Sequence, residues 1–220
     1  DCHSTAIEKN YDAASRTYNT KFAEVSVGCE ACHGQGARHV SWAQSGAVDG
    51  AQIIRMTSQQ EQMNTCAQCH SRRSQLRDGF TPEQDLFDYY LPVLLEEGLY
   101  HPDGQILEEV YVYGSYTQSK RHEQGVTCGN CHEPHSNRLR IEGNGLCTQC
   151  HNPGGRPDFP TLRRLDYESG EHHFHAQTAA SPGCVSCHMA DKTYMVIDDR
   201  RDHSFRIPRP DLSVSLNTPN

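Results

Sequence analysis

The sequence has few of the residues from which a protein core is usually built. Of its 220 residues, 35% are hydrophobic, one is tryptophan and six are phenylalanine, and the mean hydropathy is −0.76. A chain of this length is long enough for one domain or two small ones, but its own side chains can bury little apolar surface. No apolar run approaches the roughly 20 residues that a transmembrane helix needs. We therefore predict no transmembrane segment.

Positive charge is also scarce. The chain has 20 Lys and Arg against 28 Asp and Glu, which gives a formal net charge of −8. Proteins that bind nucleic acid neutralise phosphates with basic side chains, and their binding surfaces are positively charged. The charge balance therefore excludes nucleic acid as the expected partner.

Cysteine and histidine are abundant by contrast, with 11 and 14 copies. Ten cysteines fall into five C-x-x-C-H motifs, in which a histidine directly follows the second cysteine. In this motif both thiols bond to haem, and the histidine binds the iron from one face, the proximal side. We therefore predict five haem c groups. The predicted thiols are Cys29, Cys32, Cys66, Cys69, Cys128, Cys131, Cys147, Cys150, Cys184 and Cys187, with proximal ligands His33, His70, His132, His151 and His188.

The eleventh cysteine lies in the opening tripeptide Asp1-Cys2-His3, which matches the last three positions of the same motif. We predict a sixth haem at Cys2 and His3, and we expect further haem-bearing sequence upstream.

Paired cysteines also occur in zinc sites and in disulfide frameworks. Zinc sites use C-x-x-C pairs, but four tetrahedral ligands do not require a histidine directly after every second cysteine. A disulfide framework in an exported protein leaves the five histidines unexplained as well. Haem accounts for both residue types, and burying several porphyrins would replace the missing side-chain core. We therefore expect the apoprotein to be unfolded, as in small domains that fold around a metal.

The predicted fold class is mostly α with much irregular loop, a haem-stacked core and little regular β. We expect a single domain over 1–220, in which 189–220 form an extended C-terminal strap, and close neighbouring haems at His132 and His151 because the segment between them is short. Local patterns predict a short strand over 21–27, a short helix carrying His39 and a helix over 57–76. A further helix should begin at Thr81-Pro82 and break at Pro92. We also expect a turn over 98–104, a helix over 105–118, for which a strand is the alternative, and a loop over 151–160.

Electron-transfer haems usually carry a second ligand on the opposite, distal face of the iron, and two histidines set a low potential. The histidines outside the motifs are His39, His101, His122, His135, His172, His173, His175 and His203. We favour His39, His135 and His203 as distal ligands, and from the cluster at 172–175 we favour His175, with His173 second. His101 and His122 are either ligands or solvated side chains.

The chain resembles the multihaem cytochrome c module of bacterial proteins related to cytochrome c554, which are often joined to tetratricopeptide repeats. The resemblance spans nearly the whole length and rests on DCHST, VGCEACHGQGARHVSWA, GVTCGNCHEPHSNRLR, CVSCHMADKTYMV and RRDHSFRIPRPDLS. It implies a mostly helical fold with haems stacked in parallel and perpendicular pairs. It also implies that His39, His135, His175 and His203 are distal ligands, while relatives place the counterpart of His122 one residue away.

These features favour an electron carrier over a catalyst. The haems would pass single electrons to redox partner proteins or to further copies of the chain, joined head to tail in a filament. The alternative is an oxidoreductase that acts on nitrite or hydroxylamine at a five-coordinate haem. Haem is attached to C-x-x-C-H outside the cytoplasmic membrane, so we expect a periplasmic, cell-surface or extracellular location.

Overall fold

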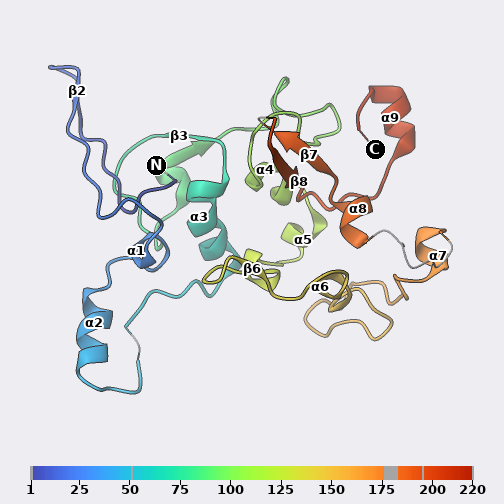
Figure 1. The fold of residues 1–220 in the computed structure, drawn as a ribbon, viewed down its shortest axis with the longest axis horizontal. Coiled ribbons are helices and arrows are strands. Elements are labelled where there is room, and N and C mark those ends of the chain that lie inside the picture. Colours follow the sequence, from blue (N-terminus) through green and yellow to red (C-terminus); the bar gives the residue numbers. More distant parts are fainter. Residues whose placement is uncertain (1, 51, 176–182, 195, 220) are drawn as a thin grey trace. The chain divides into compact units, whose positions relative to one another are not determined.

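The computed structural model describes residues 2–50, 52–175, 183–194 and 196–219 (Figure 1). The chain divides into two compact units, Asp1–Leu94 and Leu95–Asn220. The single domain over 1–220 stays a prediction. In the described residues, no helix is long and apolar enough to cross a membrane.

The first unit consists of short elements joined by loops. Two antiparallel pairs, β1 with β2 and β3 with β4, are its sheets. Its elements are β1 (Tyr11–Asp12), β2 (Thr17–Tyr18), α1 (Cys29–His33), α2 (Ala37–Gln44), α3 (Gln59–His70), β3 (Arg73–Gln75), the 3₁₀ helix η1 (Leu86–Asp88) and β4 (Tyr90–Pro92). The predicted helix carrying His39 is confirmed as α2. The strand predicted over 21–27 is wrong, because Glu24 and Lys21 form only isolated bridges to Thr5 and Glu8.

Helix α3 confirms the helix predicted over 57–76, although it is shorter. A capping box fixes its start, since the Ser58 hydroxyl accepts from the Glu61 N–H (3.2 Å) and the Glu61 carboxylate accepts from the Ser58 N–H (2.9 Å). The buried side of α3 includes Met63 and Ala67. The helix ends at His70, so the motif Cys66–His70 occupies its last turns.

The helix predicted from Thr81 is wrong. The chain makes a single turn there, from the Gln84 N–H to the Thr81 carbonyl (3.0 Å), and then forms only η1 before entering β4. Strand β4 pairs with β3, and Leu86 and Tyr90 are buried. Sheet pairing and the burial of alternate side chains therefore outweigh the helical spacing of the apolar residues.

The second unit likewise has short elements between loops. Its elements are α4 (Tyr113–Thr117), α5 (Lys120–Glu123), the 3₁₀ helix η2 (Cys128–Asn130), β5 (His132–Glu133), β6 (Arg138–Leu139), α6 (Gly145–Thr148), α7 (Gly170–His173), α8 (Cys184–His188), β7 (Asp191–Tyr194), β8 (Asp198–Arg201) and α9 (Pro210–Leu216). The turn over 98–104 is confirmed, with positive φ at Gly98 and Gly104. The loop over 151–160 is confirmed. The helix over 105–118 is confirmed only for its end, as α4.

The extended strap predicted over 189–220 is wrong. Strands β7 and β8 form an antiparallel hairpin, and α9 follows it (Figure 1). The Asp191 carboxylate lies 3.2 Å from the Arg201 guanidinium directly opposite, and Tyr194 is buried. Two of the charges that suggested a solvated strap, Asp191 and Arg201, therefore pair across two strands.

The hydrophobic core is small in both units. The buried hydrophobic side chains among the described residues are Met63, Ala67, Leu86, Tyr89, Tyr90, Tyr100, Val110, Tyr116 and Tyr194. Larger apolar side chains beside the attachment motifs stay exposed, including Val27 (60%), Leu139 (41%) and Ile141 (40%). The predicted fold class of short helices and irregular loop with little regular β is confirmed.

Candidate haem-binding sites

Three of the five C-x-x-C-H motifs lie wholly within α-helix. The motif beginning at Cys29 is α1, the one beginning at Cys184 is α8, and the one beginning at Cys66 ends α3. Residues three and four apart share one face of a helix. One turn therefore presents both thiols and the imidazole on the same side, which is what a flat porphyrin attached at one edge requires.

The attachment thiols gather in the first unit. Burial raises the pKa of the Cys69 thiol to about 11, and the neighbouring Cys2 thiol, with Cys32 further off, acts in the same direction. The Cys2 thiol also lies 3.7 Å from the Cys69 carbonyl oxygen. Three motifs that are distant in sequence therefore bring their thiols together.

The thiols of the second unit gather in the same way. Burial raises the pKa of Cys131, and the Cys150 thiol of the next motif acts in the same direction. Burial also raises the pKa of Cys184 to about 11, helped by the thiol of Cys147, with which Cys184 shares a hydrogen bond. The attachment points of all three motifs are thus near neighbours. The arrangement of the haems themselves stays a prediction.

Backbone carbonyls fix the tautomer of several histidines. The Nδ1 of His33 donates to the Ile54 carbonyl (2.7 Å), that of His188 to the Arg206 carbonyl (2.7 Å), and that of His203 to the Arg201 carbonyl (2.8 Å). A proton on Nδ1 leaves the lone pair on Nε2, the nitrogen that binds metal. Metal-binding histidines commonly donate their other ring N–H in this way.

Two pairs of imidazole rings in the second unit face each other at the spacing of axial ligands. The ring centres of His132 and His203 are 6.3 Å apart with planes at 24°, and those of His172 and His188 are 5.9 Å apart at 16°. Two imidazoles on one metal, each bound at about 2 Å, have ring centres about 6 Å apart. The ring separation at these two sites therefore matches that of two imidazoles on one iron.

The site at Cys147–His151 has a different neighbour. The Nε2 of His151 faces the guanidinium of Arg121, whose Nη2 lies 3.4 Å away, and the Arg121 guanidinium also stacks 3.8 Å from the centre of the Phe205 ring. Burial lowers the pKa of Arg121, whereas the thiols of Cys147 and Cys131 raise it. A haem on this motif would need the position that the guanidinium holds, so the site does not fit a haem without movement of Arg121.

The other predicted distal ligands lie in varied surroundings. The His39 ring stacks on Trp42 with centres 5.4 Å apart, and the His122 ring lies 5.7 Å from Tyr116. His135 is 77% exposed, and its Nδ1 donates to the Glu133 carboxylate (2.9 Å). The Nε2 of His101 is buried with no hydrogen-bond partner. The roles of these four histidines stay predictions.

In the cluster at 172–175, the structure pairs His172 with His188, where the sequence favoured His175. His175 is exposed, and its ring centre lies 5.9 Å from that of His173. Sequence reasoning also missed Arg121 and Tyr167, whose ring contacts both His151 (5.2 Å) and His172 (4.9 Å). No sequence signal marks these two residues.

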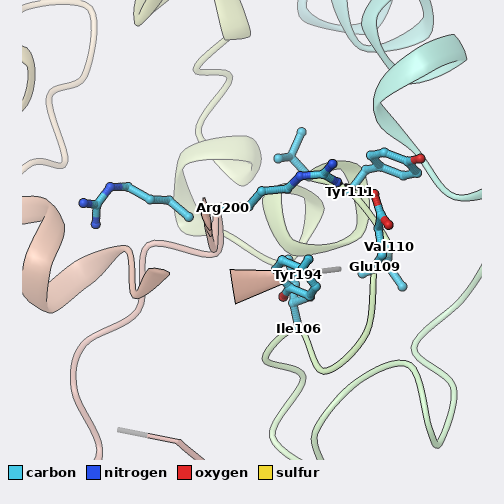
Figure 2. Close-up of a pocket in the computed structure, with 8 residues that line it drawn as sticks. Ile106, Glu109, Val110, Tyr111, Tyr194 and Arg200 are labelled. Atoms are coloured by element: carbon cyan, nitrogen blue, oxygen red, sulfur yellow. Dashed lines mark hydrogen bonds and ion pairs between the residues drawn. The ribbon is translucent and has the colours of Figure 1, made fainter. Parts of the chain in front are cut away.

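Within the described residues, no group of three or more His, Cys, Asp or Glu side chains could hold a metal ion. A haem iron needs only one or two protein ligands, because the porphyrin supplies four. A small pocket beside Tyr111, lined also by Val110, Tyr194 and Arg200, has a cavity volume of about 10 Å³ (Figure 2). It has room for about one water molecule, so Tyr111 serves packing there.

The comparisons agree with the motifs. A family model described as "Cytochrome c554 and c-prime" matches residues 1–34. The outer cell wall cytochrome OcwA is similar in structure, with 20% identity and a TM-score of 0.69, over 98% of this chain and 57% of that one. An undecaheme cytochrome from the S-layer of Carboxydothermus ferrireducens has 18% identity and a TM-score of 0.40, over 94% and 36%. A search of curated proteins found no match.

The chain spans little more than half the length of OcwA. At 20% identity the structural match establishes the fold. The family match covers two predicted attachment sites, Cys2-His3 and Cys29–His33. The motifs, the family match and the shared fold together support covalently bound haem c. The chain thus shares the fold of an outer cell wall cytochrome, and its first 34 residues match the cytochrome c554 and c-prime family model.

Proposed function

We propose that this chain carries single electrons along a series of covalently attached, mostly bis-histidine haems outside the cytoplasmic membrane. The observation that carries the proposal is the facing of His132 and His203 at 6.3 Å, because two imidazoles leave no open position on an iron between them. Such an iron exchanges electrons but binds no substrate.

The bound haem supplies the redox chemistry. The chain's own residues hold each imidazole in one orientation and one tautomer, as the carbonyls of Arg201 and Arg206 do for His203 and His188. Fixed ligands keep the surroundings of an iron the same in both oxidation states, which favours fast electron exchange. The gathered thiols support short steps between neighbouring haems within each unit.

Outside the cluster at 172–175, the proposed ligands are those expected from the sequence. The eleven cysteines attach haem, and the six motif histidines, including His3, bind iron from the proximal side. His203 is the distal ligand opposite His132. His39, His135, His101 and His122 are proposed for further irons.

Haem counting tests this proposal directly. The protein, produced with a cytochrome c maturation system, should carry five or six covalent haems by intact mass, and electron paramagnetic resonance should show mainly low-spin ferric iron. A purified protein without covalent haem would refute the function. Cell fractionation tests the location, and the outer cell wall source named for the similar structure OcwA supports it.

Self-assembly is the finer part of the proposal. Head-to-tail contacts between copies would produce an open helical filament in which electrons pass from one copy to the next. Electron microscopy of the holoprotein should show filaments with continuous density for haem. Sedimentation as a monomer at high concentration would exclude this form and leave the single-chain electron carrier in place.

One observation favours the second candidate, an oxidoreductase for small nitrogen compounds. Arg121, which lies 3.4 Å from Nε2 of His151, would have to move for a haem to bind there, and its guanidinium, which stacks on the nearby Phe205 ring, would then attract anions such as nitrite. A high-spin ferric signal that changes on adding nitrite, and that is absent from an Arg121→Gln variant, would support it. The carrier is favoured because the two other sites of this unit each have a facing imidazole.

A further inference from the structure

Three histidines at the end of α7 compete for one role. His172 and His173 lie in the helix, and His175 follows it by two residues. By sequence spacing alone all three could reach the haem attached through Cys184 and Cys187. The structure separates them by ring contacts and hydrogen bonds.

The helix end separates the His172 side chain from that of His175. In a continuous helix His172 and His175 would share a face, since they are three residues apart. Phe174 ends α7 in the left-handed conformation, with φ 59° and ψ 13°. The chain therefore turns before His175, which is exposed, while His172 stays half-buried.

His173 is occupied through both ring nitrogens. Its Nε2 donates to the Glu168 carbonyl (3.1 Å), and its Nδ1 accepts from the His175 N–H (3.1 Å). No lone pair remains for a metal while these bonds hold. The same bonds keep the His175 backbone beside His173, and their rings stack with centres 5.9 Å apart.

His172 has the ring separation from His188 that a distal ligand needs. Its ring centre lies 5.9 Å from that of His188, and the two planes are at 16°. The Nδ1 of His188 donates to the Arg206 carbonyl (2.7 Å), which directs the lone pair to Nε2. The pair thus matches the spacing of two imidazoles on one iron.

Tyr167 holds His172 in this position. Its ring packs edge-on against His172, with centres 4.9 Å apart at 71°, and its hydroxyl donates to the Arg163 carbonyl (2.9 Å). The same ring contacts His151 at 5.2 Å and 76°. Tyr167 therefore fixes the His172 side chain and lies between two neighbouring attachment sites.

We infer that His172, and not His173 or His175, is the distal ligand of the haem attached through Cys184 and Cys187, opposite His188. The inference rests on the proposed function, because it assumes that this motif carries haem. It names the one residue of the cluster on which the spin state and potential of this haem depend.

Single substitutions in the holoprotein test the assignment. His172→Gly should convert one haem from low spin to high spin in electron paramagnetic resonance, and added imidazole should restore the low-spin signal. The matched variants His173→Gly and His175→Gly should leave the spin state of every haem as in the wild type. Intact mass must show the wild-type number of haems in each variant.

His172→Met provides a second measurement if the glycine variant folds poorly. Methionine can still bind iron and raises the potential relative to histidine. One haem should then titrate at a higher midpoint potential while the rest are unchanged. The inference is overturned if neither His172 variant alters a haem, or if His173→Gly or His175→Gly creates the high-spin haem. A wild-type protein lacking covalent haem would instead refute the proposed function.

Discussion

Removing the imidazole of His203 should open one coordination position and leave the fold in place. The ring of His203 faces that of His132 at 6.3 Å, whereas the backbone N–H of His203 is held separately by the buried Ser115 hydroxyl (3.2 Å). His203→Gly keeps that backbone bond and loses the bond from Nδ1 to the Arg201 carbonyl. The lost hydrogen bond lowers the free energy of unfolding by about 1 kcal/mol, in addition to the lost ligand bond.

The substitution should change the spin state of one haem completely. With five or six haems in the chain, about one-fifth or one-sixth of the low-spin ferric signal should be replaced by a high-spin signal in electron paramagnetic resonance, because one axial imidazole in the set is lost. Added imidazole should reverse the change, since it can enter the space that the side chain leaves. His203→Met should keep that haem low-spin and raise its potential.

Phe205→Leu is the matched control. The Phe205 ring contacts the His203 ring edge-on, with centres 5.8 Å apart, so this variant disturbs the same surroundings without touching a ligand. It should leave the spin state of every haem as in the wild type. A His203→Gly protein whose haem count and spin states equal those of the wild type would refute the reasoning that facing rings at this spacing mark an iron site.

Three further predictions concern helix capping and pH. Ser58→Ala removes the hydroxyl that caps α3 and should lower its stability by about 1 kcal/mol, seen as roughly fivefold faster amide exchange in its first turns, while Ser58→Thr should not. Burial, followed by the nearby Asp202, raises the pKa of Tyr100 and Tyr194 to about 12. Their stability contribution is complete below pH 10 and is lost as the pH rises toward 12, so calorimetry should show a falling melting temperature there that the double Tyr→Phe variant lacks. The Arg209 guanidinium lowers the pKa of Asp211 to about 2. The stability that this pair contributes is present above pH 3.8 and is lost as the pH falls toward 2. Carboxyl titration by nuclear magnetic resonance should find a pKa near 3.8 in Arg209→Gln, and an unchanged low value would contradict the pairing.

The local errors in the sequence predictions have a common cause. The apolar residues after Thr81 have helical spacing, yet Leu86 and Tyr90 are buried in a segment that pairs with β3. The charged residues after Asp191 look like a solvated strap, yet opposite charges meet across a hairpin. In both places pairing with a distant segment decided the backbone, and local spacing carries no information about that partner. Helix α3 was predictable because its cap lies within four residues of its start.

The distal ligands illustrate the same limit at the site. The favoured His175 shares a helical face with His172 only if the helix continues, and the left-handed Phe174 ends it. Arg121 sits opposite His151 because α5 brings it there, and no motif marks it. The proximal residues, in contrast, follow their cysteines directly.

The sequence by itself determined the chemistry, because the spacing of two thiols and a histidine within one turn of chain is a local property that folding cannot change. It also determined the scarcity of apolar side chains, which a cofactor can replace. Only the tertiary structure decided which rings face each other, since residues as distant as His132 and His203 meet through loops whose course depends on all their contacts.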